Sequence, residues 1–284
     1  MRNKRGGYRN KIVLTEKQEN NIIKLYDNNS TIRIAKITGH SRAWILKFLT
    51  NKGIPRRGTE HRWYSIDESF FKKINTSNKA YILGFIYGDG NNYTKQYKLS
   101  ITGLESDNQI YKDIRASMKS NSKFYYKNNL KTKNRYLTLA IHSKKISNDL
   151  VKLGVIDNKT KTISFPVFLK KYLYRDFIRG IFDSDGCFTF CKQTNRNDYV
   201  GRFSISGTKK LCETIQQIFL TKLNIPLTKL AKDNRCYSNF RTLGISRLSD
   251  LVKIYKFLYS DSKIHLNRKK HKFEEYFSIR KAKL

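Results

Sequence analysis

Two stretches of this 284-residue sequence repeat one another: YILGFIYGDG at residues 81–90 and FIRGIFDSDG at residues 177–186. Each is an apolar stretch of helical character that carries two small residues four positions apart and ends on Asp-Gly. Small residues at this spacing leave a flat strip on a helix, and a second helix can approach that strip to near backbone contact. We expect two helices packed along these strips, which consist of Gly84 with Gly88 and Gly180 with Ser184.

Each stretch places an aspartate at the end of its expected helix, Asp89 in the first and Asp185 in the second, with Gly90 and Gly186 as left-handed caps. A carboxylate there lies beside the negative pole of the helix dipole, so it calls for a compensating cation. If the helices pack together, the two carboxylates meet and form a site for a divalent metal. Mg²⁺ is the expected ion because it prefers oxygen ligands. The expected metal site also includes the preceding residues, Gly88 and Ser184.

The similarity continues beyond these stretches. KLSITG at residues 98–103 resembles RFSISG at 202–207, and each is followed by an amphipathic stretch. Alternating segments, RYLTLAIH and FRTLGIS, and a last helical pattern follow in both halves. The shared order is helix, strands, helix, strands, helix over roughly one hundred residues. This order predicts an α+β fold, αββαββα in tandem, with pseudo-twofold symmetry.

The two motifs resemble those of the LAGLIDADG homing endonucleases, in the single-chain form with two motifs, and the resemblance spans about residues 66–277. It implies a saddle of antiparallel sheet on DNA and a metal-dependent double-strand break with short 3′ overhangs. The last acid of the motif, the family's metal ligand and catalytic position, falls on Asp89 and Asp185. The earlier acid, which is structural in the family, is replaced by Tyr87 in the first copy and retained as Asp183 in the second.

A second pair of positions follows from the resemblance. LGVIDNKTKTISFP at residues 153–166 is similar to the segment that closes the family's repeat, in which a lysine reaches toward the active site. This assigns Lys159, and LNRKKHKF at residues 266–273 suggests Lys269, with Lys270 as the alternative. A lysine near the metal can polarise the scissile phosphate or orient the attacking water. Ordinary surface charge is the competing interpretation of these lysines.

The alternating strands predict polar faces for the major groove. Residues of both halves and of the hairpin KFYYKNNLKTK are expected to contact DNA there: Lys98, Ser100, Thr102, Lys123, Tyr125, Lys127, Arg202, Ser204 and Ser206.

Charge independently indicates a polyanionic partner. The chain has 58 Lys and Arg against 22 Asp and Glu, a net charge of +36, while 39% hydrophobic and 13% aromatic residues suffice to build cores. The absence of a long apolar run predicts a soluble protein without a membrane partner. Four irregularly spaced cysteines, Cys187, Cys191, Cys212 and Cys236, fit a reducing interior. We interpret them as core or strand residues rather than as a zinc site.

The first 62 residues hold 15 Lys and Arg against 4 Asp and Glu. A capping box at Thr15 and Gln18 opens one helix, a second is expected after Ser30, and a third runs from Ser41 to Gly53. Small Ala35, Gly39 in the turn and apolar Ile45 have the spacing of a helix-turn-helix. The arrangement resembles the helix-turn-helix of resolvase and invertase recombinases, which implies a recognition helix with three DNA contacts, Ser41, Arg42 and Lys47.

We therefore expect a basic arm and helix-turn-helix at residues 1–57, a linker at 58–65, and repeats at 66–170 and 171–284. The predicted function is site-specific cleavage of DNA at a long recognition site by a monomer that acts inside a bacterial cell, a phage-infected cell or an organelle. Two other functions share the charge and the fold: a DNA-binding regulator without cleavage and an intron RNA maturase. A scaffold protein of unrelated function is a more distant alternative.

Overall fold

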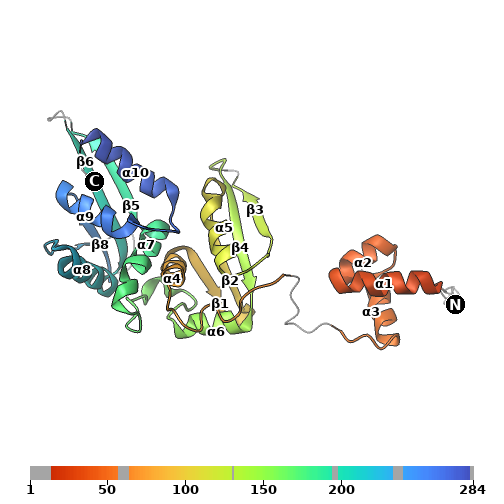
Figure 1. Ribbon diagram of the computed structural model, residues 1–284. Helices are drawn as coiled ribbons and strands as arrows, with labels where there is room; N and C mark the ends of the chain where they lie inside the picture. The colour runs from red at the N-terminus through yellow and green to blue at the C-terminus, as the bar shows by residue number, and fades with distance from the viewer. Residues whose placement is uncertain (1–13, 57–63, 130, 194–197, 233–238, 282–284) are drawn as a thin grey trace, which may run out of the picture. The chain divides into compact units, whose positions relative to one another are not determined.

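A computed structural model describes residues 14–56, 64–129, 131–193, 198–232 and 239–281 (Figure 1). The chain divides into two compact units, residues 1–63 and 64–284. The linker expected at residues 58–65 lies mostly outside the described residues. The basic arm expected at residues 1–11 and Cys236 lie outside them as well. None of the described helices is long and apolar enough to cross a membrane.

The first unit contains three helices: α1 (Glu16–Asn28), α2 (Thr31–Thr38) and α3 (Arg42–Asn51). Side chains cap them as the sequence predicts: Thr15 and Gln18 form the capping box of α1, and Ser30 caps α2. Ser41 Oγ accepts a hydrogen bond from the Trp44 amide at the start of α3. The buried core of this unit consists of Ile22, Tyr26, Ile34, Ile45, Phe48 and Leu49.

Two glycines of this unit need their conformational freedom. Gly39, between α2 and α3, has φ +72°, and Gly53, after α3, has φ +70°. L side chains rarely adopt this left-handed conformation, so both positions favour glycine. The helix boundaries predicted at these glycines are confirmed.

The second unit repeats one motif. The first copy contains α4 (Ser77–Asp89), β1 (Gly90–Tyr93), β2 (Lys98–Leu104), α5 (Asn108–Ser117), β3 (Phe124–Asn128), β4 (Arg135–His142) and α6 (Lys144–Lys152). The second contains α7 (Tyr174–Asp185), β5 (Cys187–Lys192), β6 (Tyr199–Thr208), α8 (Lys209–Leu223), β7 (Ala231–Lys232), β8 (Phe240–Ile245), α9 (Leu248–Tyr259) and α10 (Asn267–Ile279). The predicted αββαββα repeat is confirmed, and α10 is an addition to the second copy.

Each copy forms one four-stranded antiparallel sheet, with strand orders β1-β2-β4-β3 and β5-β6-β8-β7. The registers match: Ile101 lies between Gly90 and Leu139, and Ile205 of β6 lies opposite Leu243. Alternation places the apolar side chains of each central strand in the core with the helices. The opposite face of each sheet therefore carries the polar side chains.

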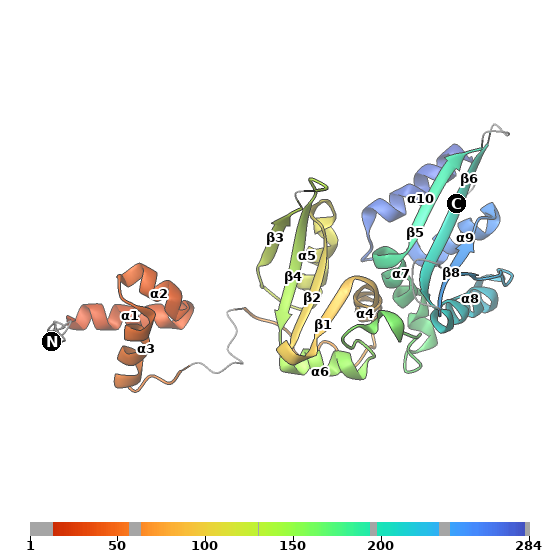
Figure 2. The ribbon, with the colours of Figure 1, turned by 180° about the vertical axis from the view of Figure 1, so that it is seen from behind.

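Helices α4 and α7 lie side by side between the two sheets (Figures 1 and 2). A Cβ at Gly84 would collide with the Phe177 carbonyl and lie 3.2 Å from Gly180 Cα. A Cβ at Gly180 would collide with the Tyr81 carbonyl and lie 2.7 Å from the Phe85 nitrogen. The helices are thus in backbone contact at this crossing, as the small residues predict.

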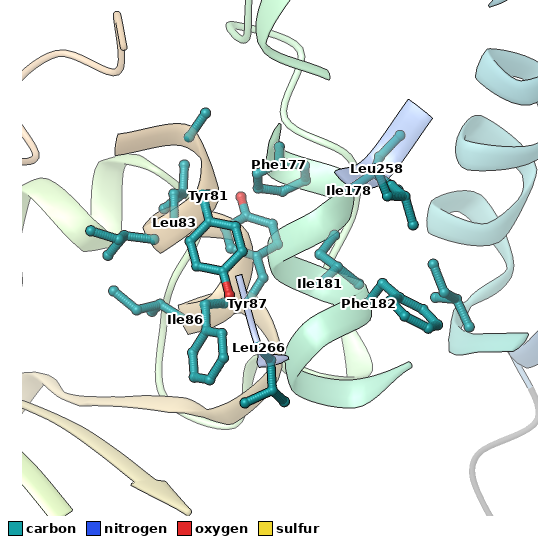
Figure 3. Close-up of a cluster of buried hydrophobic side chains, with 14 of the residues drawn as sticks. Tyr81, Leu83, Ile86, Tyr87, Phe177, Ile178, Ile181, Phe182, Leu258 and Leu266 are labelled. Carbon is teal, nitrogen blue, oxygen red and sulfur yellow. The ribbon is translucent and has the colours of Figure 1, made fainter. Parts of the chain in front are cut away.

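Large apolar side chains surround the crossing (Figure 3). Tyr87 of α4 and Phe177 of α7 meet edge to face, with ring centroids 4.9 Å apart. The rest of the cluster includes Leu83, Ile86, Ile178, Ile181, Phe182, Leu258 and Leu266, all buried. The two motif helices therefore form the centre of a core that both repeats share.

The expected left-handed caps of these helices are wrong. Gly90 has φ −86° and Gly186 has φ −72°, both extended, because strands β1 and β5 begin directly after the aspartates. Glycine is required here for space instead. A Cβ at Gly90 would lie 2.8 Å from the Ile86 carbonyl oxygen, and one at Gly186 would lie 2.7 Å from the Phe182 carbonyl oxygen.

The glycines at the crossing predict a large loss of stability on enlargement. We expect Gly84→Ala and Gly180→Ala each to lower the free energy of unfolding by about 3 kcal/mol or more, because the added methyl meets backbone that cannot move aside. The matched control is Gly207→Ala in β6, where the three atoms nearest to the added Cβ are side-chain carbons of Leu211, at 3.0 Å or more. Denaturant titration measures all three variants. Equal midpoints for Gly84→Ala, Gly207→Ala and the wild type would contradict backbone contact.

Candidate active site

The two motif aspartates come together at the ends of α4 and α7. Asp89 and Asp185 are the last residues of their helices, and a Cβ at Gly88 would lie 3.0 Å from Asp185 Cγ. The helix crossing at Gly84 and Gly180 fixes this proximity, because both aspartates lie five residues beyond a crossing glycine. The pair predicted from the sequence is therefore a single site in the structure.

Both carboxyl groups have raised pKa values. Burial and, to a smaller extent, the neighbouring Asp185 raise the pKa of Asp89 to about 6, against the opposing charges of Lys269, Lys159 and Arg268. Asp185 is open to solvent on one side, yet burial of the remainder of the group raises its pKa as well, again against the two lysines. Two partly desolvated acids in proximity favour either a proton or a cation.

The two predicted lysines lie at this site in matching positions. Lys159 Nζ donates to the carbonyl oxygens of Gly88, at 3.3 Å, and of Gly90. Lys269 Nζ donates to three carbonyl oxygens, those of Phe182 at 2.6 Å, Ser184 at 3.2 Å and Gly186 at 2.6 Å. Each lysine thus binds the carbonyl groups on both sides of the aspartate of its own repeat.

Both lysines are buried, with 6% of each residue exposed. Burial lowers the pKa of Lys269 to about 8 and also lowers that of Lys159, while the aspartates oppose both shifts. The alternative residue Lys270 is half-buried and lies 3.9 Å from Glu274 on the same helix. Of the two candidates in the second repeat, Lys269 is the one at the carboxylates.

The donor set fits a hard divalent cation. It offers two carboxylates and the carbonyl oxygens of Gly88 and Ser184, and oxygen is what Mg²⁺ prefers. The carbonyls already accept hydrogen bonds from the lysines, so the carboxylates are the primary candidate ligands. Within the described part of the chain, no cluster of three or more His, Cys, Asp or Glu residues gathers to hold a metal.

Asp183, the retained earlier acid of the second motif, is in the core. Its carboxylate accepts hydrogen bonds from Tyr81 Oη at 2.8 Å, Tyr259 Oη at 2.7 Å and the Leu266 amide at 2.8 Å. Tyr87, at the matching position of the first motif, donates instead to the Leu153 carbonyl at 2.6 Å. Both positions therefore bind the motif helices to their surroundings, and neither faces the candidate metal site.

The residues predicted on the polar face of the first sheet differ in how far they are exposed. Thr102 is exposed and forms a hydrogen bond with Thr138 across the strands at 2.8 Å, and Tyr125 is 63% exposed. Lys123 and Lys127 are exposed, and Lys98 is half-buried. The exposure expected of Ser100 is absent, since only 8% of it is exposed, between the neighbouring strands β1 and β4.

The polar face of the second sheet carries a hydroxyl pair at the same place as the first. Ser206 forms a hydrogen bond with Thr242 at 2.7 Å, at the place that Thr102 and Thr138 occupy in the first sheet. Arg202 is exposed, and Ser204 is half-buried. Thr138 and Thr242 were not among the predicted residues, although the alternation of their segments could have indicated them.

Two of the cysteines also lie on the second polar face. Cys187 and Cys191 are exposed and four residues apart on β5, on the same face as Ser204 and Arg202. Residues four apart on a strand are about 13 Å from one another. They cannot ligate one ion, so the expectation of strand cysteines rather than a zinc pair is confirmed for them. Cys212 is buried.

In the first unit, the predicted contact residues are open. Arg42 and Lys47 are exposed on α3, and Ser41 is exposed although its hydroxyl caps the helix. His40 stacks on Trp44 at 4.0 Å at the start of the same helix.

No protein-family model and no curated protein matches this sequence. Solved structures do match. The LAGLIDADG homing endonuclease I-LtrWI, bound to target DNA, aligns with 73% of this chain and 91% of its own at 13% identity and a TM-score of 0.50. This chain has the LAGLIDADG homing endonuclease fold. A mutant of I-SmaMI aligns with 72% of this chain and 90% of its own, also at 13% identity and a TM-score of 0.50. The expected LAGLIDADG architecture of two tandem repeats is confirmed.

The raised pKa of Asp89 predicts a dependence of stability on pH. The folded-state pKa of Asp89, about 6, exceeds the unfolded-state value near 4. Protonation of such an acid stabilises the folded state fully below about pH 4, and this stability is lost as the pH rises through about 6. Asn does not titrate. In the presence of EDTA, Asp89→Asn should therefore raise the free energy of unfolding at pH 7 by up to about 3 kcal/mol, and the gain should disappear below about pH 4.

Denaturant titrations across this pH range measure the effect. The matched control is Glu275→Gln, which removes an exposed carboxylate from α10. A pH-independent effect of Asp89→Asn, or an equal effect of the control, would contradict desolvation of Asp89.

Proposed function

We propose that this protein is a site-specific, metal-dependent endonuclease that makes double-strand breaks in DNA. The observation that carries the proposal is the pair of partly desolvated carboxylates, Asp89 and Asp185, at the adjoining ends of the two helices that lie between the sheets. In a chain of net charge +36, a site that concentrates negative charge serves a cation. The same fold is bound to target DNA in I-LtrWI, which supports duplex DNA as the partner.

Asp89 and Asp185 would hold Mg²⁺, with the carbonyl groups of Gly88 and Ser184 beside them. When bound, the metal supplies Lewis-acid stabilisation of the phosphate and activation of water. Lys159 and Lys269 hold the backbone on both sides of each carboxylate, so the carboxylates do not need to reorganise when the substrate arrives. Each repeat thus contributes one acid and one lysine, which suits the cleavage of one phosphodiester bond on each strand.

The polar sheet faces would contact the DNA on either side of this site. Hydroxyl, ammonium and guanidinium groups are the donors and acceptors that read base edges and bind phosphates. They come from both repeats, which we assign to residues 66–170 and 171–284, so one monomer covers a long recognition site. The proposed contacts are Lys98, Thr102, Lys123, Tyr125, Lys127, Arg202, Ser204 and Ser206, without the buried Ser100.

The first unit would extend this recognition site. We assign residues 1–57 to a helix-turn-helix whose α3 enters the major groove with Ser41, Arg42 and Lys47. Ile34 and Ile45 are fully buried between α2 and α3, and the exposed face of α3 is basic, as a recognition helix requires.

Cleavage is tested by incubating the purified protein with a library of long duplexes and sequencing the ends that are produced. We expect cuts at one site with Mg²⁺ and none with Ca²⁺. Asp89→Asn and Asp185→Asn should each lower the cleavage rate about 100-fold or more while duplex affinity stays nearly intact. Glu275→Gln should cut as the wild type does. Wild-type rates in both aspartate variants, or no cleavage with Mg²⁺, would refute the proposal; retained binding without cleavage would indicate a regulator.

The role of α3 is tested separately by affinity. Arg42→Ala and Lys47→Ala should each weaken binding of the target duplex about tenfold, because each removes one groove or phosphate contact. The rate of cleavage at saturating enzyme should not change. Lys24→Ala, which removes an exposed charge from α1, is the matched control. Fluorescence anisotropy gives the affinities, and equal values for all variants and the wild type would argue against a recognition helix.

A further inference from the structure

The ammonium group of Lys269 has no free hydrogen-bond donor for a substrate. An ammonium group has three donors, and Lys269 Nζ donates to three backbone carbonyl oxygens at the end of α7. The side chain is also buried. Lys269 therefore holds the helix end and does not contact a phosphate.

The preceding residue, Arg268, is a cation of a different kind. Its Nε donates to both carboxylate oxygens of Asp107, at 3.1 and 2.9 Å. Arg268 belongs to α10 of the second repeat, whereas Asp107 lies just before α5 of the first repeat, so the bond joins the two halves. The side chain of Asp107 is only 11% exposed, which makes it a fixed anchor for the guanidinium group.

The outer part of the same guanidinium group is open. The Arg268 side chain is 54% exposed, and among the described residues no hydrogen-bond partner occurs for its two Nη groups. Arg268 directly precedes Lys269, whose Nζ binds the carbonyl oxygens on both sides of Asp185, so the backbone of Arg268 lies at the candidate site. Arg268 thus presents a charged fork of free N–H donors at the candidate site, and such a fork matches the geometry of a phosphate.

Among the residues that the structure describes, the other half of the site has no equivalent of this arginine and its anchor. Thr208 is the N-cap residue of α8, as Asp107 is of α5, and its hydroxyl donates to the Ile163 carbonyl at 2.6 Å. Asn158 precedes Lys159 as Arg268 precedes Lys269. Asn158 carries no charge, and its φ of 56° is left-handed, whereas Arg268 lies in the helix α10. The cation therefore distinguishes the two halves of an otherwise symmetric site.

We propose that Arg268 binds a DNA phosphate at the candidate site, on one strand only, and that Asp107 of the first repeat holds it in position for this contact. The inference rests on the proposed function. It assigns the second repeat's substrate-binding cation to Arg268 in place of Lys269, and it makes the two strands of the duplex unequal.

The test measures target-duplex affinity in Ca²⁺ over a series of KCl concentrations, with Arg268→Ala and Arg268→Gln. Loss of one phosphate contact should lower the slope of log affinity against log salt concentration by about 0.9 in both variants. Lys256→Ala, which removes an exposed charge from α9, should keep the wild-type slope. Gln retains length and polarity, so a stability defect confined to the Ala variant does not decide the result.

Single-turnover cleavage with each strand labelled separately gives the second readout. Arg268→Gln should slow one strand about 100-fold and the other far less. Asp107→Asn should slow the same strand while the salt slope stays near the wild-type value, because the charge remains but its anchor is weakened. Wild-type slopes in both Arg268 variants, or equal slowing of both strands, would overturn the proposal.

These outcomes separate the two proposals. If the wild type binds the duplex and cuts neither strand, the endonuclease function fails, while the salt slope still decides whether Arg268 binds a phosphate. If the wild type cuts both strands and the slope is unchanged in the Arg268 variants, the function stands and the assignment of Arg268 fails.

Discussion

Everything at the candidate site depends on the direct contact of two helix backbones. Because Gly84 and Gly180 have no side chains, α4 and α7 meet with carbonyl groups and Cα atoms in van der Waals contact. A methyl group at either position would separate the helices and, with them, the aspartates that lie five residues further along each chain. Charge repulsion between two carboxylates opposes this arrangement, so the apolar core around the crossing has to hold it together.

Different polar groups hold the motif helix in place in the two repeats. In the second repeat, a buried carboxylate, Asp183, joins α7 to Tyr81, Tyr259 and the Leu266 amide. Arg179 of the same helix pairs with Asp176 at 2.8 Å and donates to the carbonyls of Leu258 and Ile264. In the first repeat, the Tyr87 hydroxyl of α4 donates to the Leu153 carbonyl instead. The chain keeps a symmetric backbone while the polar groups that fasten it differ.

The buried lysines explain how a helix can end on an acid. The last carbonyl groups of a helix have no partner within it, and a cation nearby is favourable. Lys159 and Lys269 supply both the hydrogen bonds and the charge, at the cost of burial that lowers their own pKa values. The unfavourable position of each aspartate is therefore compensated by a residue about 70 to 85 positions away in the chain.

The sequence by itself determined the repeat, its order of elements, the helix crossing and the pair of aspartates. These features follow from local periodicity and from small residues at fixed spacing, and a linear pattern carries both. Only the tertiary structure decided that Gly90 and Gly186 are extended, that Ser100 is buried and that Asp107 of one repeat holds Arg268 of the other. Strand register and contacts between distant segments set these outcomes. Whether a lysine still has a donor free, as Lys269 does not, likewise depends on how many partners the fold brings within 3 Å or so, and no spacing in the sequence encodes that number.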